Sequence, residues 1–196
     1  MSKGRRYPLR VPRYAAGIRA QEPRGSSGRS WWAAEWMRRM EAMGLRGRLG
    51  RGRNYAISGQ VVSLAIAGPE VSASVQGSRP EPYAVTISFR TPDDAAHARI
   101  VSAIRAEPVR VAQLLADDLP QEIEGFFRDE GLDLFPGGRL GPGRYDVTTA
   151  CSCPDYANPC KHSAAVMFLL GEEVARRPLT LLELRGILPE ELFDED

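Results

Sequence analysis

The sequence predicts an α+β protein, in which a small antiparallel sheet with packed helices is followed by a ββα zinc finger. Three observations predict this fold class. Three consecutive segments alternate apolar and polar residues, which is the period of half-buried strands. Apolar residues at helical spacing lie before and after these segments. All three cysteines of the 196-residue chain fall within ten residues, next to one of its two histidines.

The chain divides into three parts by composition. Residues 1–29 are rich in Arg, Gly, Pro and Ser and poor in large apolar residues, so we expect a basic arm with no fixed structure alone. Residues 30–140 hold the periodic segments and are expected to form the α+β domain. Residues 141–196 begin in a stretch rich in glycine and proline and are expected to form the zinc finger with C-terminal helices.

A tryptophan-rich helix is expected first, over residues 31–43, with Ser30 as its N-cap and Gly44 as its stop. Residues 47–53 indicate a basic, glycine-rich linker. Exposed tryptophans can stack on nucleic-acid bases, but tryptophans at helical spacing more often belong to a core, so we expect Trp32 and Trp36 to face inward. The residues at helical spacing are Trp32, Trp36, Met40 and Met43.

Three strands are expected to form an antiparallel meander with one buried face. Gly-Pro and Gly-Ser pairs separate the alternating runs, as turns between strands do. The residues expected to share one face in each strand are Val62, Leu64 and Ile66; Val71, Ala73 and Val75; and Tyr83, Val85, Ile87 and Phe89.

Three helices should follow, and each has a proline near its start. Pro92 is expected in the first turn of a helix that runs to about Arg105, while Pro108 and Pro120 open the next two. The residues expected to face inward are Ala96, Ile100 and Ile104; Val111, Leu114 and Leu115; and Ile123, Phe126 and Phe127.

Charge is distributed unevenly along the chain, although the net charge is only +1. Residues 1–53 hold 14 Lys/Arg and three acids, whereas the remainder holds 12 basic and 22 acidic residues. This uneven distribution of charge indicates a basic arm that binds an anionic partner and is attached to a slightly acidic body. Arginine-rich termini can also be solvated tails. No apolar run approaches the roughly 20 residues of a membrane span, and the N-terminus lacks a signal core, so we expect a cytoplasmic protein.

Cys151, Cys153, Cys160 and His162 form a C-x-C-x6-C-x-H pattern. In an extended chain, side chains two residues apart point the same way, so the first two cysteines can face one ion together. A turn through residues 154–159 would bring the other two residues to that ion from the opposite side. Three sulfurs and one imidazole suit the tetrahedral coordination of Zn²⁺. The spacing therefore predicts one zinc ion, held in front of the apolar helical run that follows.

Four protein ligands leave a zinc ion no position for an activated water, so we expect a structural site and no enzymatic activity. The competing interpretations are a Cys–His nucleophile pair, a redox pair of cysteines and buried free cysteines. A hydrolase or nuclease is a further interpretation, because adjacent acids occur at Asp93-Asp94 and Asp117-Asp118. Helix capping and solvation are the commoner explanation of such pairs.

The four-residue pattern followed by an apolar helix resembles the SWIM zinc finger, whose four ligand positions it matches without departure. Flanking segments are similar to bacterial SWIM zinc finger family proteins, so the resemblance extends over residues 30–188. The resemblance implies a ββα module that binds DNA or mediates protein contacts, and a Swi/Snf-type helicase as a candidate partner. The flanking segments are Ser30-Trp31-Trp32, Val75-Gln76-Gly77-Ser78-Arg79, Cys153-Pro154-Asp155, Cys160-Lys161-His162-Ser163-Ala164-Ala165-Val166 and Leu184-Arg185-Gly186.

We therefore expect a zinc-binding accessory protein that binds DNA through its basic arm and its finger. We expect neither a membrane nor a small-molecule substrate among its partners. The alternative is a protein–protein adaptor, for example for a helicase, without direct nucleic-acid binding. Arg79 and Lys161 also have an ordinary interpretation as exposed cations of a loop and a helix start. The candidate nucleic-acid contacts are Arg5, Arg6, Arg10, Arg13, Arg48, Arg51, Arg53, Arg79 and Lys161.

Overall fold

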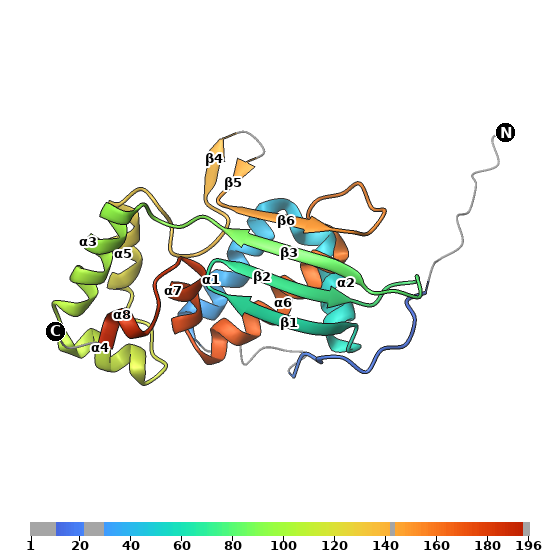
Figure 1. The fold of residues 1–196 in the computed structure, drawn as a ribbon, viewed down its shortest axis with the longest axis horizontal. Helices are drawn as coiled ribbons and strands as arrows, with labels where there is room; N and C mark the ends of the chain where they lie inside the picture. Colours follow the sequence, from blue (N-terminus) through green and yellow to red (C-terminus); the bar gives the residue numbers. More distant parts are fainter. Residues whose placement is uncertain (1–10, 22–29, 142–143, 194–196) are drawn as a thin grey trace.

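The protein is α+β, as the sequence predicts, and a four-stranded antiparallel sheet lies at its centre (Figure 1). The structure, a computed structural model, describes residues 11–21, 30–141 and 144–193. The sheet has the order β1-β2-β3-β6, and β4 and β5 form a separate two-stranded ribbon. The strands are β1 (Val61–Ala67), β2 (Glu70–Val75), β3 (Tyr83–Phe89), β4 (Arg139–Gly141), β5 (Arg144–Tyr145) and β6 (Val147–Cys151).

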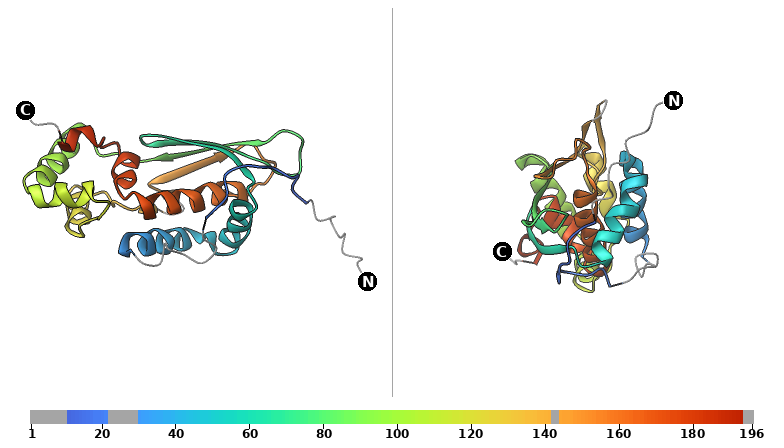
Figure 2. Two further views of the ribbon diagram at one scale, coloured as in Figure 1. Left: turned by 90° about the horizontal axis from the view of Figure 1, so that it is seen from below. Right: turned by 90° about the vertical axis from the view of Figure 1, so that its right-hand side faces the viewer.

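Helices cover one face of the sheet in two layers (Figure 2). Helix α6 packs directly on the strands, and α1 and α2 pack on the far side of α6. The helices α3, α4, α5 and α8 form a lobe at the end of the molecule away from α2 (Figure 1). The helices are α1 (Trp31–Met40), α2 (Arg46–Ile57), α3 (Asp94–Arg105), α4 (Pro108–Leu115), α5 (Glu122–Asp129), α6 (Lys161–Arg176), α7 (Leu179–Leu184) and α8 (Glu190–Phe193).

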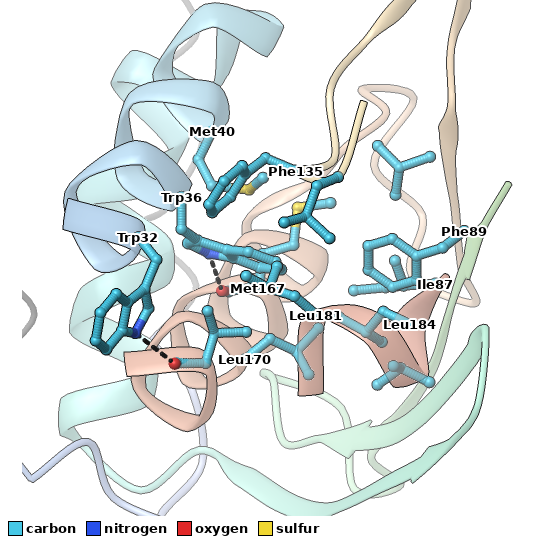
Figure 3. Close-up of a cluster of buried hydrophobic side chains, with 14 of the residues drawn as sticks. Trp32, Trp36, Met40, Ile87, Phe89, Phe135, Met167, Leu170, Leu181 and Leu184 are labelled. Carbon is cyan, nitrogen blue, oxygen red and sulfur yellow. Dashed lines mark hydrogen bonds between the residues drawn. The ribbon is translucent and has the colours of Figure 1, made fainter. Parts of the chain in front are cut away.

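The tryptophans of α1 belong to the core, as predicted for Trp32 and Trp36. Trp36 is fully buried against α6, where its indole N–H donates to the Met167 carbonyl at 3.3 Å. The indole of Trp32 donates to the Val174 carbonyl at 3.1 Å (Figure 3). Trp31 is half-buried and donates to the Leu119 carbonyl at 2.9 Å. All three indole groups are therefore bonded to the protein's own backbone.

The prediction of a linker at residues 47–53 is wrong, because this stretch lies inside α2. Gly44 does not end the first helix either, since a π-helical turn, Glu41–Leu45, joins α1 directly to α2. Glycine is a poor helix former, but α2 packs closely on α6 and buries Leu49 and Ala56 there. Tertiary packing thus outweighs the local preference of this glycine-rich segment.

Gly52 is the point where α2 comes closest to α6. A Cβ atom on Gly52 would lie 2.7 Å from the backbone carbon and the Cβ of Ala164. Gly52→Ala is therefore expected to destabilise the protein by about 1–3 kcal/mol, as overpacking does. Gly50→Ala is the matched control, because its Cβ would meet nothing within 4 Å, and it should be neutral or stabilising. Urea unfolding measures both, and equal stability of the two variants would contradict this packing.

Two predicted inward positions face solvent instead. Val62 is exposed because β1 has a register shift between Val61 and Ser63, so that Val61 takes the buried position. Leu115 is 61% exposed, because α4 buries only Leu114 fully. The alternation in β2 and β3 is confirmed, since their predicted inward residues are all buried.

Part of the predicted arm is ordered against the body. The amide of Arg13 donates to the Gly77 carbonyl at 2.9 Å, and the amide of Gly17 donates to the Gly59 carbonyl at 3.0 Å. The expectation that residues 1–29 lack fixed structure therefore does not hold for residues 11–21, because backbone hydrogen bonds attach them to the ends of α2 and β2. Residues 1–10 and 22–29 lie outside the described part.

The uncovered face of the sheet is made of small side chains. Strand register brings alanines, serines and threonines side by side across the four strands. Glu70 is the only charged residue of β1, β2, β3 and β6. The outward residues include Ala65, Ala67, Ser72, Ser74, Ala84, Thr86, Ser88, Thr148 and Ala150.

Strand β6 carries the first cysteine of the motif and pairs with β3 over Val147–Cys151. Buried residues from both sides of position 140 also belong to one hydrophobic cluster. The division of the chain at this position stays a prediction. Within the described residues, no helix is both long and apolar enough to cross a membrane.

Candidate metal centre

Strand β6 and helix α6 present the four predicted ligands to one another. Cys151 is the last residue of β6 and lies opposite Val85, whose side chain is on the helix-covered face of the sheet. Cys153 follows two residues later. Cys160 is the N-cap of α6, and His162 lies in the first turn of that helix. The sheet edge and the helix N-terminus therefore meet at this group.

The ligand atoms of these four residues all lie within 4.8 Å of one another. His162 Nδ1 is 3.8 Å from Cys151 Sγ and 3.7 Å from Cys160 Sγ. A tetrahedral zinc ion with its usual bond lengths requires S···N separations of about 3.6 Å. Both the donor set and its spacing therefore fit one zinc ion. The predicted cofactor, a single Zn²⁺, is the ion that this group can bind.

Hydrogen bonds within the group favour one thiolate. The Cys151 thiol donates to Cys160, which lowers the pKa of Cys160 and raises the pKa of Cys151. Burial raises the pKa of Cys153. The amide of Ser163 donates to Cys160 Sγ at 3.5 Å, and the positive end of the α6 dipole lies beside the same sulfur. A Zn²⁺ ion that takes the place of the proton between Cys151 and Cys160 would bind all three sulfurs as thiolates.

Two tyrosines that the sequence did not assign to the site form the walls around His162. The ring centroid of Tyr83 is 4.7 Å from that of His162, and the Tyr55 centroid is 5.3 Å away, edge to face. Gly77 closes the third side, because a Cβ there would lie 2.3 Å from the Tyr83 ring and 3.4 Å from His162 Nε2. The sequence signals near this wall were the segment Val75–Arg79 and the expected inward position of Tyr83.

The loop between Cys153 and Cys160 has its own hydrogen bonds. The Asn158 side chain donates to the Thr149 carbonyl on β6 at 2.8 Å and contacts the Thr149 hydroxyl. Asp155 accepts from the Ala157 amide at 3.1 Å. The loop is thus attached to the sheet edge as well as to the two cysteines at its ends.

Three of the predicted nucleic-acid contacts lie around this centre. Lys161 Nζ is 5.3 Å from the Tyr55 ring centroid, and the Arg79 guanidinium is 5.9 Å from that of Tyr83. Arg13 reaches the same wall through its backbone bond to Gly77. We call this region, formed by residues 11–17, α2, residues 76–82 and residues 152–162, the finger end (Figure 1, right-hand side).

The remaining predicted contacts are the three arginines of α2 and three residues outside the described part. Arg51 is exposed, whereas Arg48 and Arg53 are half-buried. The Arg53 guanidinium is 6.0 Å from the ring centroid of Phe168. Helix α2 contains no acidic residue. The three residues outside the description are Arg5, Arg6 and Arg10.

The cations described at the finger end lack acidic partners, whereas most arginines in the rest of the molecule have one. Among the described residues, none of the six predicted contacts, Arg13, Arg48, Arg51, Arg53, Arg79 and Lys161, has an acidic side chain within ion-pair distance. Elsewhere most arginines are paired, as Arg99 is with Glu130 at 2.6 Å. The other paired arginines are Arg38, Arg39, Arg110, Arg128, Arg176, Arg177 and Arg185.

Comparison with known proteins agrees with the geometry of the centre. The family model described as SWIM zinc finger matches residues 144–171, which run from β5 into α6 and contain all four ligands. The chain carries a SWIM zinc finger. The resemblance inferred from the ligand pattern is thereby confirmed, and the SWIM finger of this chain consists of β5, β6, the ligand loop and the first part of α6.

A relative extends the similarity beyond the SWIM finger. Uncharacterized protein Rv2102 of Mycobacterium tuberculosis is 38% identical over 186 residues. The alignment covers 95% of this chain but 65% of the relative, so the chain spans just under two thirds of that protein's length. No solved structure matches the chain significantly.

Proposed function

We propose that this chain is a zinc-stabilised accessory protein, without enzymatic activity, that binds DNA through its finger end and its basic arm. The observation that carries the proposal is the gathering of unpaired cations at the finger end, while most arginines elsewhere are neutralised by acids. Unpaired arginines are free to exchange their counterions for phosphates, which is the main source of DNA affinity. We place this activity in the cytoplasm.

The zinc ion acts in this proposal by holding the binding surface together. It would link β6 to α6 and thereby fix Lys161 and the loop 154–159 beside α2. Four protein ligands leave no position for an activated water. The SWIM finger therefore supplies structure, and the cations around it supply the contacts to phosphate.

Salt dependence of DNA binding tests the proposal. We expect the affinity of the full chain for a duplex to fall steeply between about 50 and 200 mM salt, since each neutralised phosphate contributes a slope of about −0.9. Arg48→Gln with Arg51→Gln should weaken binding to any sequence and flatten the slope by about 2. Removal of residues 1–29 should flatten it further. Fluorescence anisotropy measures all three.

Arg99→Gln with Arg128→Gln is the matched control, because these arginines are exposed but paired with Glu130 and Glu124. This control should leave the slope unchanged. Absence of binding by the full chain at low salt would overturn the proposal, as would an equal loss of affinity in the control and in the α2 variant.

A second candidate is an adaptor that docks a protein such as a Swi/Snf-type helicase. It is favoured by the exposed apolar face of α4, where Val109 is 69% and Leu115 is 61% exposed. The lobe around α4 is acidic, with ten acids and four arginines in residues 91–134. The test is binding of a purified helicase from the same host. Binding to the wild type but not to Leu115→Asp would support this candidate. Equal binding to the wild type and to Cys160→Ala would exclude the SWIM finger as the docking surface.

A further inference from the structure

The tryptophans belong to the body and are not available to stack on bases, whereas two tyrosines are available. The indoles of Trp31, Trp32 and Trp36 are all hydrogen-bonded within the body. Among the described residues, only Tyr14 and Tyr156 have aromatic side chains that lie mostly in solvent, with exposed fractions of 82% and 104%. Both lie at the finger end, the region where the cations are unpaired.

Tyr156 lies on the loop between Cys153 and Cys160, which is anchored to the body. The loop is attached at Cys153 and Cys160, its two ends, and by the Asn158 side chain to the edge of β6. The Asp155 side chain, which accepts from the amide of Ala157, fixes the turn in which the tyrosine lies. A loop backbone anchored in this way can offer an exposed ring to a ligand at a lower cost in conformational entropy than a free segment.

Tyr14 lies on the ordered part of the arm, between two backbone anchors. Arg13 donates to the Gly77 carbonyl at 2.9 Å, and Gly17 donates to the Gly59 carbonyl at 3.0 Å. Gly77 is also the residue that closes the wall around His162. The second exposed ring is therefore attached to the same wall of the metal centre that Tyr83 and Arg79 form.

The chemistry of the finger end differs from that of the uncovered sheet face. The finger end carries both exposed rings together with the unpaired cations Arg13, Arg79 and Lys161. Apart from Val62 and Glu70, the outward side chains of the sheet are alanine, serine and threonine, so they include neither aromatic rings nor cations. Stacking and phosphate contact can therefore occur together at the finger end and not on the sheet.

We propose that the finger end binds single-stranded nucleic acid, with Tyr156 and Tyr14 stacking on unpaired bases while neighbouring cations contact the phosphates. This proposal rests on the proposed function and specifies its ligand. Stacking requires the flat face of a base, which is free in a single strand and covered by its neighbours in a duplex. Aromatic rings interleaved with positive charge are the usual means by which proteins hold single strands without sequence preference.

Anisotropy of the full, zinc-loaded chain with labelled oligothymidylate and with a duplex of equal length, about 15 nucleotides, tests the proposal. We expect tighter binding of the single strand. Tyr156→Ala should weaken that binding by between about fivefold and about 150-fold, with a similar loss for Tyr14→Ala. Neither variant should change duplex binding by more than about twofold, because the phosphate contacts remain.

Tyr156→Phe is the matched control, since it keeps the ring and should keep single-strand affinity. Zinc content and circular dichroism should stay unchanged in all these variants, because both side chains lie in solvent. If the duplex binds as tightly as the single strand, or if both alanine variants bind oligothymidylate like the wild type, this proposal is overturned while the proposed function stands. Absence of binding to either nucleic acid overturns both.

Discussion

Cys160→Ala is expected to abolish zinc binding and to cause the largest loss of stability of any single substitution in this chain. Cys160 is buried, contributes a sulfur to the metal group and caps α6. Its loss removes one of four ligands and leaves the N-terminus of a core helix without its cap. Zinc binding by such a segment contributes directly to its folding free energy. We expect the loss to exceed the roughly 2–5 kcal/mol of a large-to-small core substitution.

Thermal unfolding with and without a chelator measures this effect and supplies its control. The chelator should lower the Tm of the wild type strongly and should leave Cys160→Ala unchanged, because that variant has no bound zinc to lose. A chelator effect of equal size on both proteins, or a variant as stable as the wild type, would show that the metal does not stabilise the fold.

Arg185→Met is expected to cost about 3–5 kcal/mol, because it leaves the buried carboxylate of Asp146 without its partner. Arg185 and Asp146 are both almost fully buried, and their side chains are 2.6 Å apart. The same guanidinium donates to the carbonyls of Leu134 at 3.0 Å and Arg90 at 2.8 Å. This one side chain therefore links α7 to the end of β3, to the helical lobe and to the SWIM finger.

Arg177→Met is the control for that prediction. Arg177 also pairs with a carboxylate, that of Glu183, but its side chain is half exposed, so its loss should cost less than about 1 kcal/mol. Denaturant unfolding compares the two variants. A double variant in which Asp146→Leu accompanies Arg185→Met should recover part of the stability, since no uncompensated charge remains. Equal costs for Arg177→Met and Arg185→Met would contradict the assignment of the buried network.

The strands and the metal centre were predictable because their signals are local. Alternation in β2 and β3 places Val71 and Ile87 in the core, as the sequence predicts. The ligand pattern is also local, since the end of β6, the loop after it and the N-terminus of α6 supply all four ligands within twelve residues. Ligand identity and spacing are therefore enough to predict one zinc site from the sequence.

The features that the sequence did not show depend on contacts between distant segments. Helix α2 packs closely on α6 at Gly52, beside Ala164, about a hundred residues away, and no local propensity reveals this contact. The wall around His162 likewise combines Tyr55 with Tyr83 from separate elements. Glycine and arginine in 47–53 indicated a basic, glycine-rich linker, whereas packing on α6 makes this stretch part of a helix.

The zinc content of the purified full-length chain tests the central claim most directly. Native mass spectrometry, with the cysteines kept reduced, should give about one zinc ion per chain, released together with the loss of α6 helicity when a strong chelator is added. A chain that carries no zinc while its cysteines are reduced and its fold is intact would contradict the claim that Cys151, Cys153, Cys160 and His162 hold a structural metal ion.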